Sequence, residues 1–197
     1  MRNLKIYKKA LIVVDMVNGF ATEGGSLYDE EIRKIIPGQI KLIKENIRNG
    51  SLIIFVKDTH AIDSVEHDRF GGIKHCIKGS KEEELVDELK VFENRDDTIS
   101  IEKNSTSFME TDEFRKVIDE ATSLEEIEVC GCCTDICISN GVIPMMNYFD
   151  QHNRRVKVKV YEDLTETFNS ESHNREEYSK AAYLLMAQQG AKILKKY

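Results

Sequence analysis

The chain has 197 residues and a formal net charge of −7, from 28 Lys and Arg against 35 Asp and Glu. This acidic balance argues against nucleic acid or an anionic membrane surface as the main partner, and no apolar run approaches the ~20 residues of a spanning helix. The N-terminal stretch has too few apolar residues for a signal peptide, so we expect a cytoplasmic protein with one domain over residues 1–197.

The first part of the chain alternates a strand, a helix and a second strand. Residues 9–17 form a β-branched apolar run, and residues 30–49 place isoleucines at helical spacing, with Pro37 expected to break or restart the helix. A second strand is predicted at 51–58. Residues 59–79 have no periodicity and hold three of the five histidines, which favours a functional loop.

A capping-box pattern follows this loop. Ser80, with Glu83 three residues later, predicts the start of a helix whose apolar face carries Leu85, Val86 and Leu89.

The remainder continues the alternation of strands and helices. Thr111 is expected to cap its helix. Strands are predicted at 96–103, 125–132, 154–163 and 191–196, and helices at 111–122, 135–150 and 174–189. This alternation predicts an α/β fold: a three-layer sandwich with a mostly parallel six-stranded sheet and helices on both faces.

Three polar residues stand at the ends of apolar runs. Asp15 ends the first, Lys103 ends the third predicted strand, and Cys137 follows the fourth. An open α/β sheet gathers such groups in one crevice at the carboxyl ends of its strands. An acid, a lysine and a thiol there indicate a cysteine nucleophile with a proton-handling partner.

The cysteine distribution does not indicate a disulfide framework. There are five cysteines, an odd number, and four of them lie between Cys130 and Cys137. Cys130 and Cys133 form a C-x-x-C, but no second one completes a four-thiolate zinc site. Cys130 and Cys132 share one face of a predicted strand, where free cysteine acts as a small hydrophobe.

Five segments, in order along the chain, carry a resemblance to a known family. They are LIVVDMVNGF at 11–20, VKDTH at 56–60, KHCIKGS at 74–80, EKNSTSF at 102–108 and VCGCCTDICI at 129–138. On these residues the chain resembles the isochorismatase-like cysteine hydrolases, and within them the nicotinamidase-related branch.

The resemblance implies roles for the catalytic residues. Cys137 is the expected nucleophile, Asp15 takes its proton and returns it to the leaving ammonia, and Lys103 holds the ion pair and orients the substrate. A thiolate is expected at Cys137, favoured by the helix N-terminus and the lysine. The family also implies a cis peptide bond between Cys132 and Cys133, which aims the Cys133 N–H, with that of Cys137, at the oxyanion.

A metal site is also implied. Asp58 and His60 form D-x-H, and positions i and i+2 of an extended segment point the same way. By itself the pattern is more often a pair of polar loop residues. His75, however, resembles the family's next metal ligand, with Glu66 preferred over His67 as the fourth. Oxygen and imidazole ligands suit one divalent metal ion, zinc first, with iron or manganese as alternatives.

The pocket departs from the pattern that nicotinamidases often show. Val17 stands where the family often has glutamine, and the chain has no tryptophan to stack on a pyridine ring. Phe20 and Phe108 are the aromatic candidates for substrate binding.

The sequence therefore predicts an amidohydrolase that converts nicotinamide, or a similar small amide, to the acid and ammonia through a thioester. We also expect a homo-oligomer. One alternative is another hydrolase of the same fold, acting on an isochorismate-like vinyl ether or a carbamoyl compound; isochorismatases generally lack the metal ligands and the cysteine. The other is a non-catalytic protein whose clustered cysteines respond to oxidant.

Overall fold

A single sheet of six strands, all parallel, organises the computed structural model, which describes residues 3–197. The strand order is β3-β2-β1-β4-β5-β6. The strands are β1 (Lys9–Val14), β2 (Leu52–Asp58), β3 (Thr98–Lys103), β4 (Glu126–Cys132), β5 (Lys157–Glu166) and β6 (Lys192–Leu194). The six strands predicted from sequence are confirmed, and the last is an edge strand.

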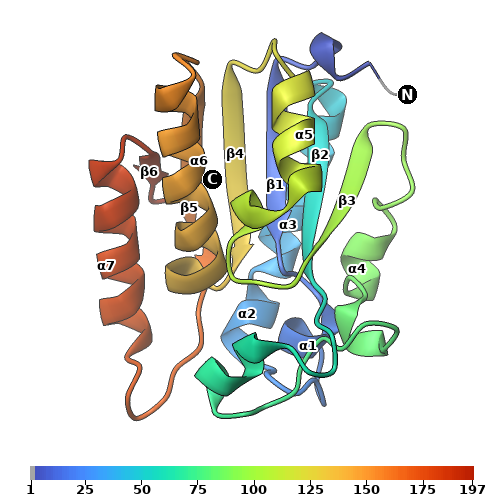
Figure 1. The fold of residues 1–197 in the computed structure, drawn as a ribbon, viewed down its shortest axis with the longest axis vertical. Coiled ribbons are helices and arrows are strands. Elements are labelled where there is room, and N and C mark those ends of the chain that lie inside the picture. The colour runs from blue at the N-terminus through green and yellow to red at the C-terminus, as the bar shows by residue number, and fades with distance from the viewer. Residues whose placement is uncertain (1–2) are drawn as a thin grey trace.

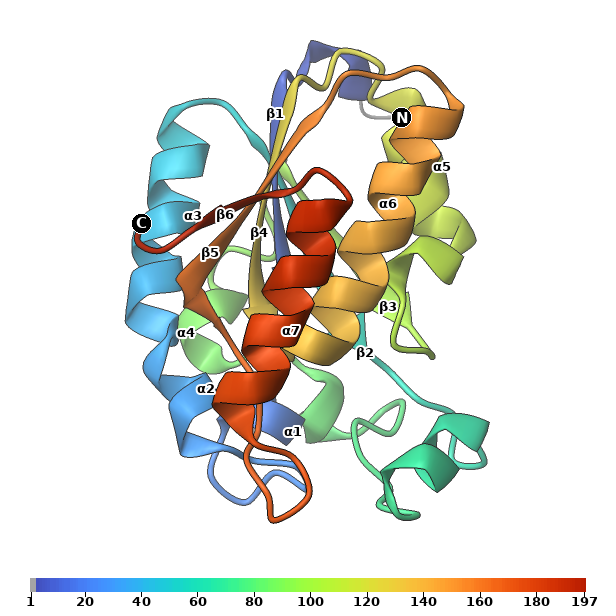
Figure 2. The ribbon, with the colours of Figure 1, turned by 90° about the vertical axis from the view of Figure 1, so that its left-hand side faces the viewer.

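Helices cover both faces of this sheet, as the two views in Figures 1 and 2 show. One face carries α5 (Asp112–Glu120), α6 (Ser139–Gln151) and α7 (Arg175–Gln188). The other carries α2 (Glu30–Lys34), α3 (Ile36–Arg48) and the short α4 (Asp87–Lys90), with α1 (Asn18–Ala21) at one end. Within residues 3–197 no helix combines the length and apolar character needed to cross a bilayer.

The central strand β1 contributes to two separate cores. Ala10, Ile12 and Val14 pack among α5, α6 and α7, whereas Leu11 and Val13 pack toward α2 and α3. All five side chains are fully buried. A strand covered on both faces needs apolar residues at every position, which explains the unbroken run that the sequence shows.

Helix boundaries follow the capping residues. The segment predicted as one helix at 30–49 is two helices, and Pro37 lies in the first turn of α3, where its missing N–H costs nothing. Asp29 caps α2 by accepting from the N–H groups of Glu31 and Ile32. Thr111 caps α5 by accepting from Phe114 N–H at 3.2 Å, as predicted.

The predicted capping-box helix at Ser80 is wrong. Lys81–Glu83 forms only a 3-10 turn, and the next residues are extended until α4 begins. Their backbone is used elsewhere: Glu84 O accepts from Asn18 N–H at 2.9 Å, and the Val86 N–H donates to Met16 O at 3.1 Å. Pairing with the segment after β1 thus replaces the helical hydrogen bonds that the local sequence favours.

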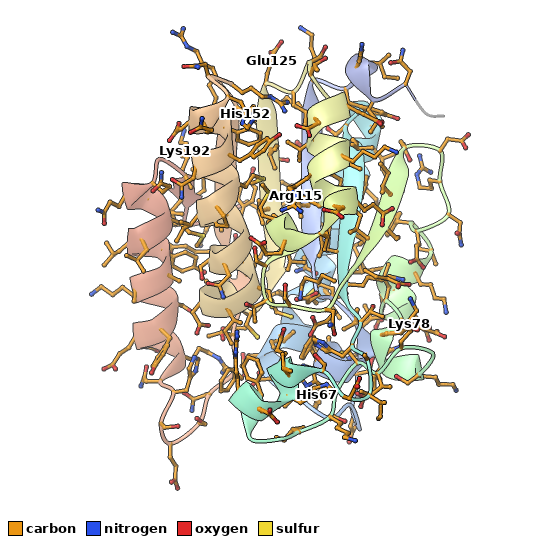
Figure 3. All side chains as sticks on the ribbon, in the orientation of Figure 1. His67, Lys78, Arg115, Glu125, His152 and Lys192 are labelled. Carbon is orange, nitrogen blue, oxygen red and sulfur yellow. The ribbon has the colours of Figure 1, made fainter. Side chains whose placement is uncertain are left out.

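The strand order reverses between β1 and β4, and this switch point defines the site. Ligands of open α/β sheets bind at the carboxyl ends of the strands beside such a switch. At this point Gly131 has φ +127°, and a Cβ there would lie 2.0 Å from Val14 O, so only glycine fits. Figure 3 shows His67 at this end of the molecule and Glu125, which precedes β4, at the other.

Candidate active site and metal centre

A cavity of about 600 Å³ opens at the carboxyl ends of the strands. Its buried inner half contains the residues that the sequence singled out: Asp15, Asp58, Glu66, His75 and Cys137. Its outer walls come from three segments, residues 26–32, 69–73 and 168–172.

Lys103 joins the acid and the thiol at the inner end. Its Nζ lies 2.9 Å from Asp15 Oδ2, donates to Asp58 Oδ1 at 2.6 Å, and contacts Cys137 Sγ at 3.5 Å. The lysine is 2% exposed and Asp15 is fully buried. Four segments far apart in sequence therefore bring one cation, two carboxylates and one thiol together.

Burial and the lysine set the protonation of this cluster. Burial raises the pKa of Asp15 to about 6, although the Lys103 cation opposes the shift. Burial also raises the pKa of the Cys137 thiol well above its ordinary value, and Lys103 offsets only part of that increase. These shifts favour a carboxylate beside a neutral thiol over the thiolate expected from the sequence. Desolvation of the sulfur outweighs the neighbouring cation.

The nucleophile lies in a tight turn between β4 and α6. The Cys132–Cys133 peptide bond is cis, as the resemblance implied, and a π-helical turn over Thr134–Ile138 carries Cys137. Within residues 3–197 the Cys133 N–H donates no hydrogen bond. Since Cys133 and Cys137 both line the cavity, this donor is available to an oxygen atom bound beside the sulfur.

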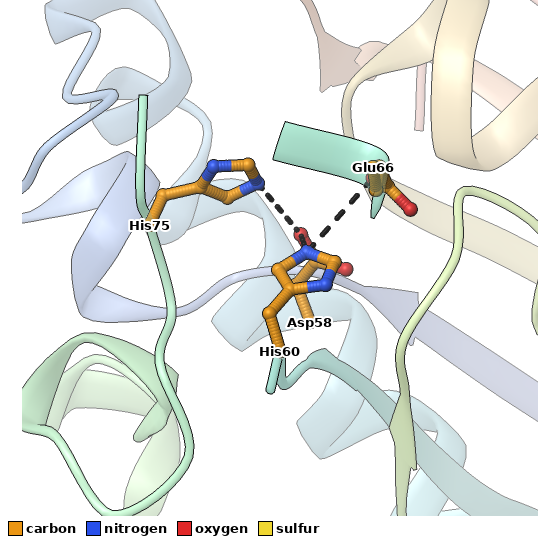
Figure 4. A group of neighbouring side chains, drawn as sticks. All are labelled: Asp58, His60, Glu66 and His75. Carbon is orange, nitrogen blue, oxygen red and sulfur yellow. Dashed lines mark hydrogen bonds and ion pairs between the residues drawn. The ribbon is translucent and has the colours of Figure 1, made fainter. Parts of the chain in front are cut away.

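Four side chains form a group that could hold a metal ion (Figure 4). Asp58, His60, Glu66 and His75 each offer one ligand atom, and these atoms lie within 4.8 Å of one another. All four residues are buried. Asp58 Oδ2 lies 2.9 Å from His60 Nε2 and 3.5 Å from His75 Nε2. This set matches the ligands expected from the sequence, including the preferred Glu66.

The hydrogen bonds behind the histidines orient them for this role. His75 Nδ1–H donates to the carbonyl of Ile73 at 2.9 Å. His60 Nδ1–H donates to Asn104 Oδ1 at 3.0 Å. Both bonds fix the tautomer that leaves the Nε2 lone pair facing the cluster, which is how proteins commonly orient metal-ligating imidazoles. The donor set, two imidazoles and two carboxylates, fits a divalent zinc, iron or manganese ion.

His67, the alternative fourth ligand, is buried beside this group. Its ring meets those of His60 and His75 edge-on, with centroids 5.1 and 5.2 Å away. Its Nε2 has no hydrogen-bond partner in the described part of the chain. The ligand group itself is formed without it.

The two aromatic residues predicted to bind substrate lie in different parts of the structure. Phe20 lines the cavity, and its ring centroid lies 5.8 Å from that of His75. Phe108 is fully buried in the core and does not line the cavity, so its predicted substrate contact is wrong. Its ring covers Gly141 on α6, where a Cβ would lie 1.9 Å from it, and is tilted against the ring of Phe114 with centroids 4.7 Å apart. Because Gly141 has no side chain, the Phe108 ring packs over it and does not reach the cavity.

Sequence reasoning missed most of the outer wall. Tyr28, Arg69, Phe70 and Phe168 line the cavity, and none belongs to a motif with a recognised role. Phe168 follows β5, so the rule that functional groups follow strands would have found it.

Two side-chain contacts hold the wall formed by residues 168–172. Arg175 Nη2 donates to both carboxylate oxygens of Asp29 at 2.6 Å and so ties this wall to the opposite one. His173 Nε2 lies 2.8 Å from Asp135 Oδ2, in the turn that carries Cys137. The shape of the cavity is therefore fixed by contacts between distant segments.

Comparison with known proteins agrees with this geometry. A family model described as the isochorismatase domain matches residues 9–196. Nicotinamidase 1 of Arabidopsis thaliana is 33% identical over 144 residues, which cover 67% of this chain and 57% of that protein. The crystal structure of nicotinamidase PncA from Bacillus subtilis is 26% identical with a TM-score of 0.78, covering 95% of this chain and 99% of that one.

A further structure supports the fold alone. The pyrazinamidase of Pyrococcus horikoshii, in complex with zinc, has a TM-score of 0.76 and covers 96% of this chain and 99% of that one. Its sequence is 24% identical to this chain.

Proposed function

Because the chain belongs to the isochorismatase family, we propose that it is a metal-containing cysteine amidohydrolase that converts nicotinamide, or a similar small amide, to the acid and ammonia. The observation that carries the proposal is the position of Lys103 Nζ, within 3.5 Å of Asp15, Asp58 and Cys137. The nicotinamidases among its relatives support the amide substrate.

Acylation begins from the neutral thiol. Asp15 accepts the Cys137 proton as the sulfur attacks the amide carbonyl, because its carboxylate is ionised above pH of about 6 while the thiol is not. The backbone N–H groups of Cys133 and Cys137 donate to the oxyanion, and one such donor typically contributes about 3 kcal/mol to the transition state. Asp15 then protonates the departing nitrogen, and ammonia leaves a thioester on Cys137.

Hydrolysis of the thioester uses the same groups. Asp15, again a carboxylate, takes a proton from water as the water oxygen attacks the thioester carbonyl. The sulfur leaves with a proton and the free acid is released. Throughout, Lys103 keeps two buried carboxylates and the sulfur close together, since its positive charge offsets their repulsion.

Asp58, His60, Glu66 and His75 would hold one divalent ion, zinc first, beside this centre. Such an ion supplies a Lewis-acid position to which a pyridine nitrogen can bind. Phe20, whose ring lies near His75, packs against the substrate ring. The cytoplasmic location and the homo-oligomer stay predictions.

Ammonia release from a panel of small amides, including nicotinamide and pyrazinamide, tests the proposal. We expect Cys137→Ala to lose roughly a thousandfold or more in kcat, as removal of a nucleophile does elsewhere. The matched control is Cys130→Ala, because Cys130 is fully buried in β4 and faces the core. Equal activity of both variants on the best amide would refute the nucleophile assignment.

A further inference from the structure

Basic groups lie beside the carboxylates that line the cavity. Each lies within 4.0 Å of a basic group. The pairs are Asp15 and Asp58 with Lys103, Glu66 with His60, and Asp29 with Arg175. The outer walls contribute one carboxylate to the lining, that of Asp29, and it is paired with Arg175, so an anion bound there meets no unpaired negative charge.

Arg69 is the exception among the charged lining residues. Its side chain lies on the exposed rim of the cavity, and within residues 3–197 it forms no ion pair or hydrogen bond. The chain as a whole carries a net charge of −7. An unpaired cation at the entrance to a site is thus against the general trend of the surface, and it favours anionic ligands.

The rest of the outer half presents hydrogen-bond donors. Tyr28, Ser170 and Ser172 line it, and their hydroxyl groups bond to no other residue of 3–197. Asn169 uses its Oδ1 to accept from Arg175 N–H, which leaves its amide N–H groups for a ligand. A guanidinium with hydroxyl and amide donors around it is the set that recognises a carboxylate or another oxyanion.

The size of the cavity leaves room for such a group. A volume of about 600 Å³ lies in the range of roughly 300–1,000 Å³ that drug-sized ligands fill. A single-ring amide bound beside Cys137 would occupy the buried inner half. The outer half, between Tyr28, Arg69 and residues 168–172, would remain open to a substituent.

We infer that the outer half of the cavity binds an oxyanion and that the preferred substrates are amides carrying a carboxylate or similar anionic group remote from the scissile carbonyl. Arg69 determines this preference. The inference rests on the proposed amidohydrolase function, and it names a substrate class narrower than small amides in general.

The test compares nicotinamides that carry a methyl, a carboxylate or an aminomethyl group at one ring position. One series of three carries the group meta to the carboxamide, and a second series carries it para. For the wild type we expect kcat/KM for the carboxylate to exceed that for the methyl compound by about tenfold, which corresponds to about 1.4 kcal/mol. The preference should arise mainly in KM and weaken as salt is raised.

Variants of Arg69 give the decisive comparison. In Arg69→Gln the ratio of carboxylate to methyl substrate should fall to about one, and in Arg69→Glu the aminomethyl compound should become the better substrate. Arg155→Gln is the matched control, because Arg155 is exposed beyond α6 and does not line the cavity. Its ratio should equal that of the wild type. An Arg69→Gln ratio equal to the wild-type ratio would overturn the inference.

A binding measurement separates this inference from the proposed function. Calorimetry on zinc-loaded Cys137→Ala compares isophthalate with benzoate, which differ by one carboxylate. We expect isophthalate to bind about tenfold more tightly, and the difference to disappear when Arg69→Gln is added. If no amide is hydrolysed but this difference is found, the proposed function fails and the oxyanion site stands. Equal binding of the two acids would refute the site.

Discussion

Replacing Lys103 by methionine tests the centre of the proposed mechanism. Methionine keeps most of the lysine volume but removes the charge that lies between Asp15 and Asp58. Two buried carboxylates are then left facing each other without a cation. Since breaking a buried ion pair by removing one partner typically costs about 3–5 kcal/mol, we expect a loss of that size in the free energy of unfolding at neutral pH.

Lys78→Met is the matched control. Its Nζ lies 2.7 Å from Glu102 Oε2, nearly the same distance as the 2.6 Å between Lys103 Nζ and Asp58 Oδ1. The side chains of Lys78 and Glu102 are 69% and 48% exposed, however, and surface pairs of this kind contribute only about 0–1 kcal/mol. Burial, not distance, should therefore separate the two variants.

Urea unfolding of chelator-treated proteins measures the stability difference without a contribution from bound metal. The pH dependence of iodoacetamide alkylation at Cys137, followed by peptide mass spectrometry, reports the thiol. Because Lys103 lowers the pKa of this buried thiol, alkylation in Lys103→Met should require higher pH. Equal stability of the two lysine variants, with an unchanged alkylation profile, would refute the reasoning.

Three further predictions follow from the site and the core. Burial raises the pKa of Asp15 to about 6, and only its carboxylate accepts the thiol proton. The value of kcat/KM should therefore rise with pH and level off above about pH 6. Asp15→Asn should lower kcat and remove this rise of kcat/KM with pH. Elemental analysis should find one divalent metal per chain, lost in His75→Ala but kept in the exposed His152→Ala, and chelation should lower activity. Gly141→Ala should cost about 1–3 kcal/mol of stability, measured by urea unfolding, because its Cβ would overlap Phe108; a gain of about 1 kcal/mol, usual for an exposed helix glycine, would contradict that packing.

Much of the fold follows from local patterns in the chain. The unbroken apolar run in β1 is what a strand covered on both faces requires, and Pro37 and Thr111 set helix boundaries by local backbone chemistry. The helix predicted at Ser80 does not form, because the backbones of Glu84 and Val86 hydrogen-bond to a segment more than sixty residues earlier. A capping pattern describes only its own neighbourhood and carries no information about such pairing.

The residues of the inner half of the cavity could also be predicted from the sequence, because they follow strands whose carboxyl ends must meet. Asp15, Lys103 and Cys137 obey that rule. The protonation states of these residues could not be predicted from the sequence. A thiol pKa depends on how much solvent the fold removes, and at Cys137 burial exceeds the effect of the lysine.

The walls of the cavity were decided by tertiary structure alone. Phe20 and Phe108 look equivalent in sequence, yet only Phe20 reaches the cavity, since the ring of Phe108 fills the space above Gly141. Arg69 belongs to residues 59–79, whose sequence has no periodicity to fix its direction, and the 3-10 helix over Val65–Phe70 that carries it was not predicted. The sequence by itself therefore determined the chemistry at the strand ends, where topology forces neighbours together. The surfaces that would select a substrate depend on packing between loops and helices, which no local pattern encodes.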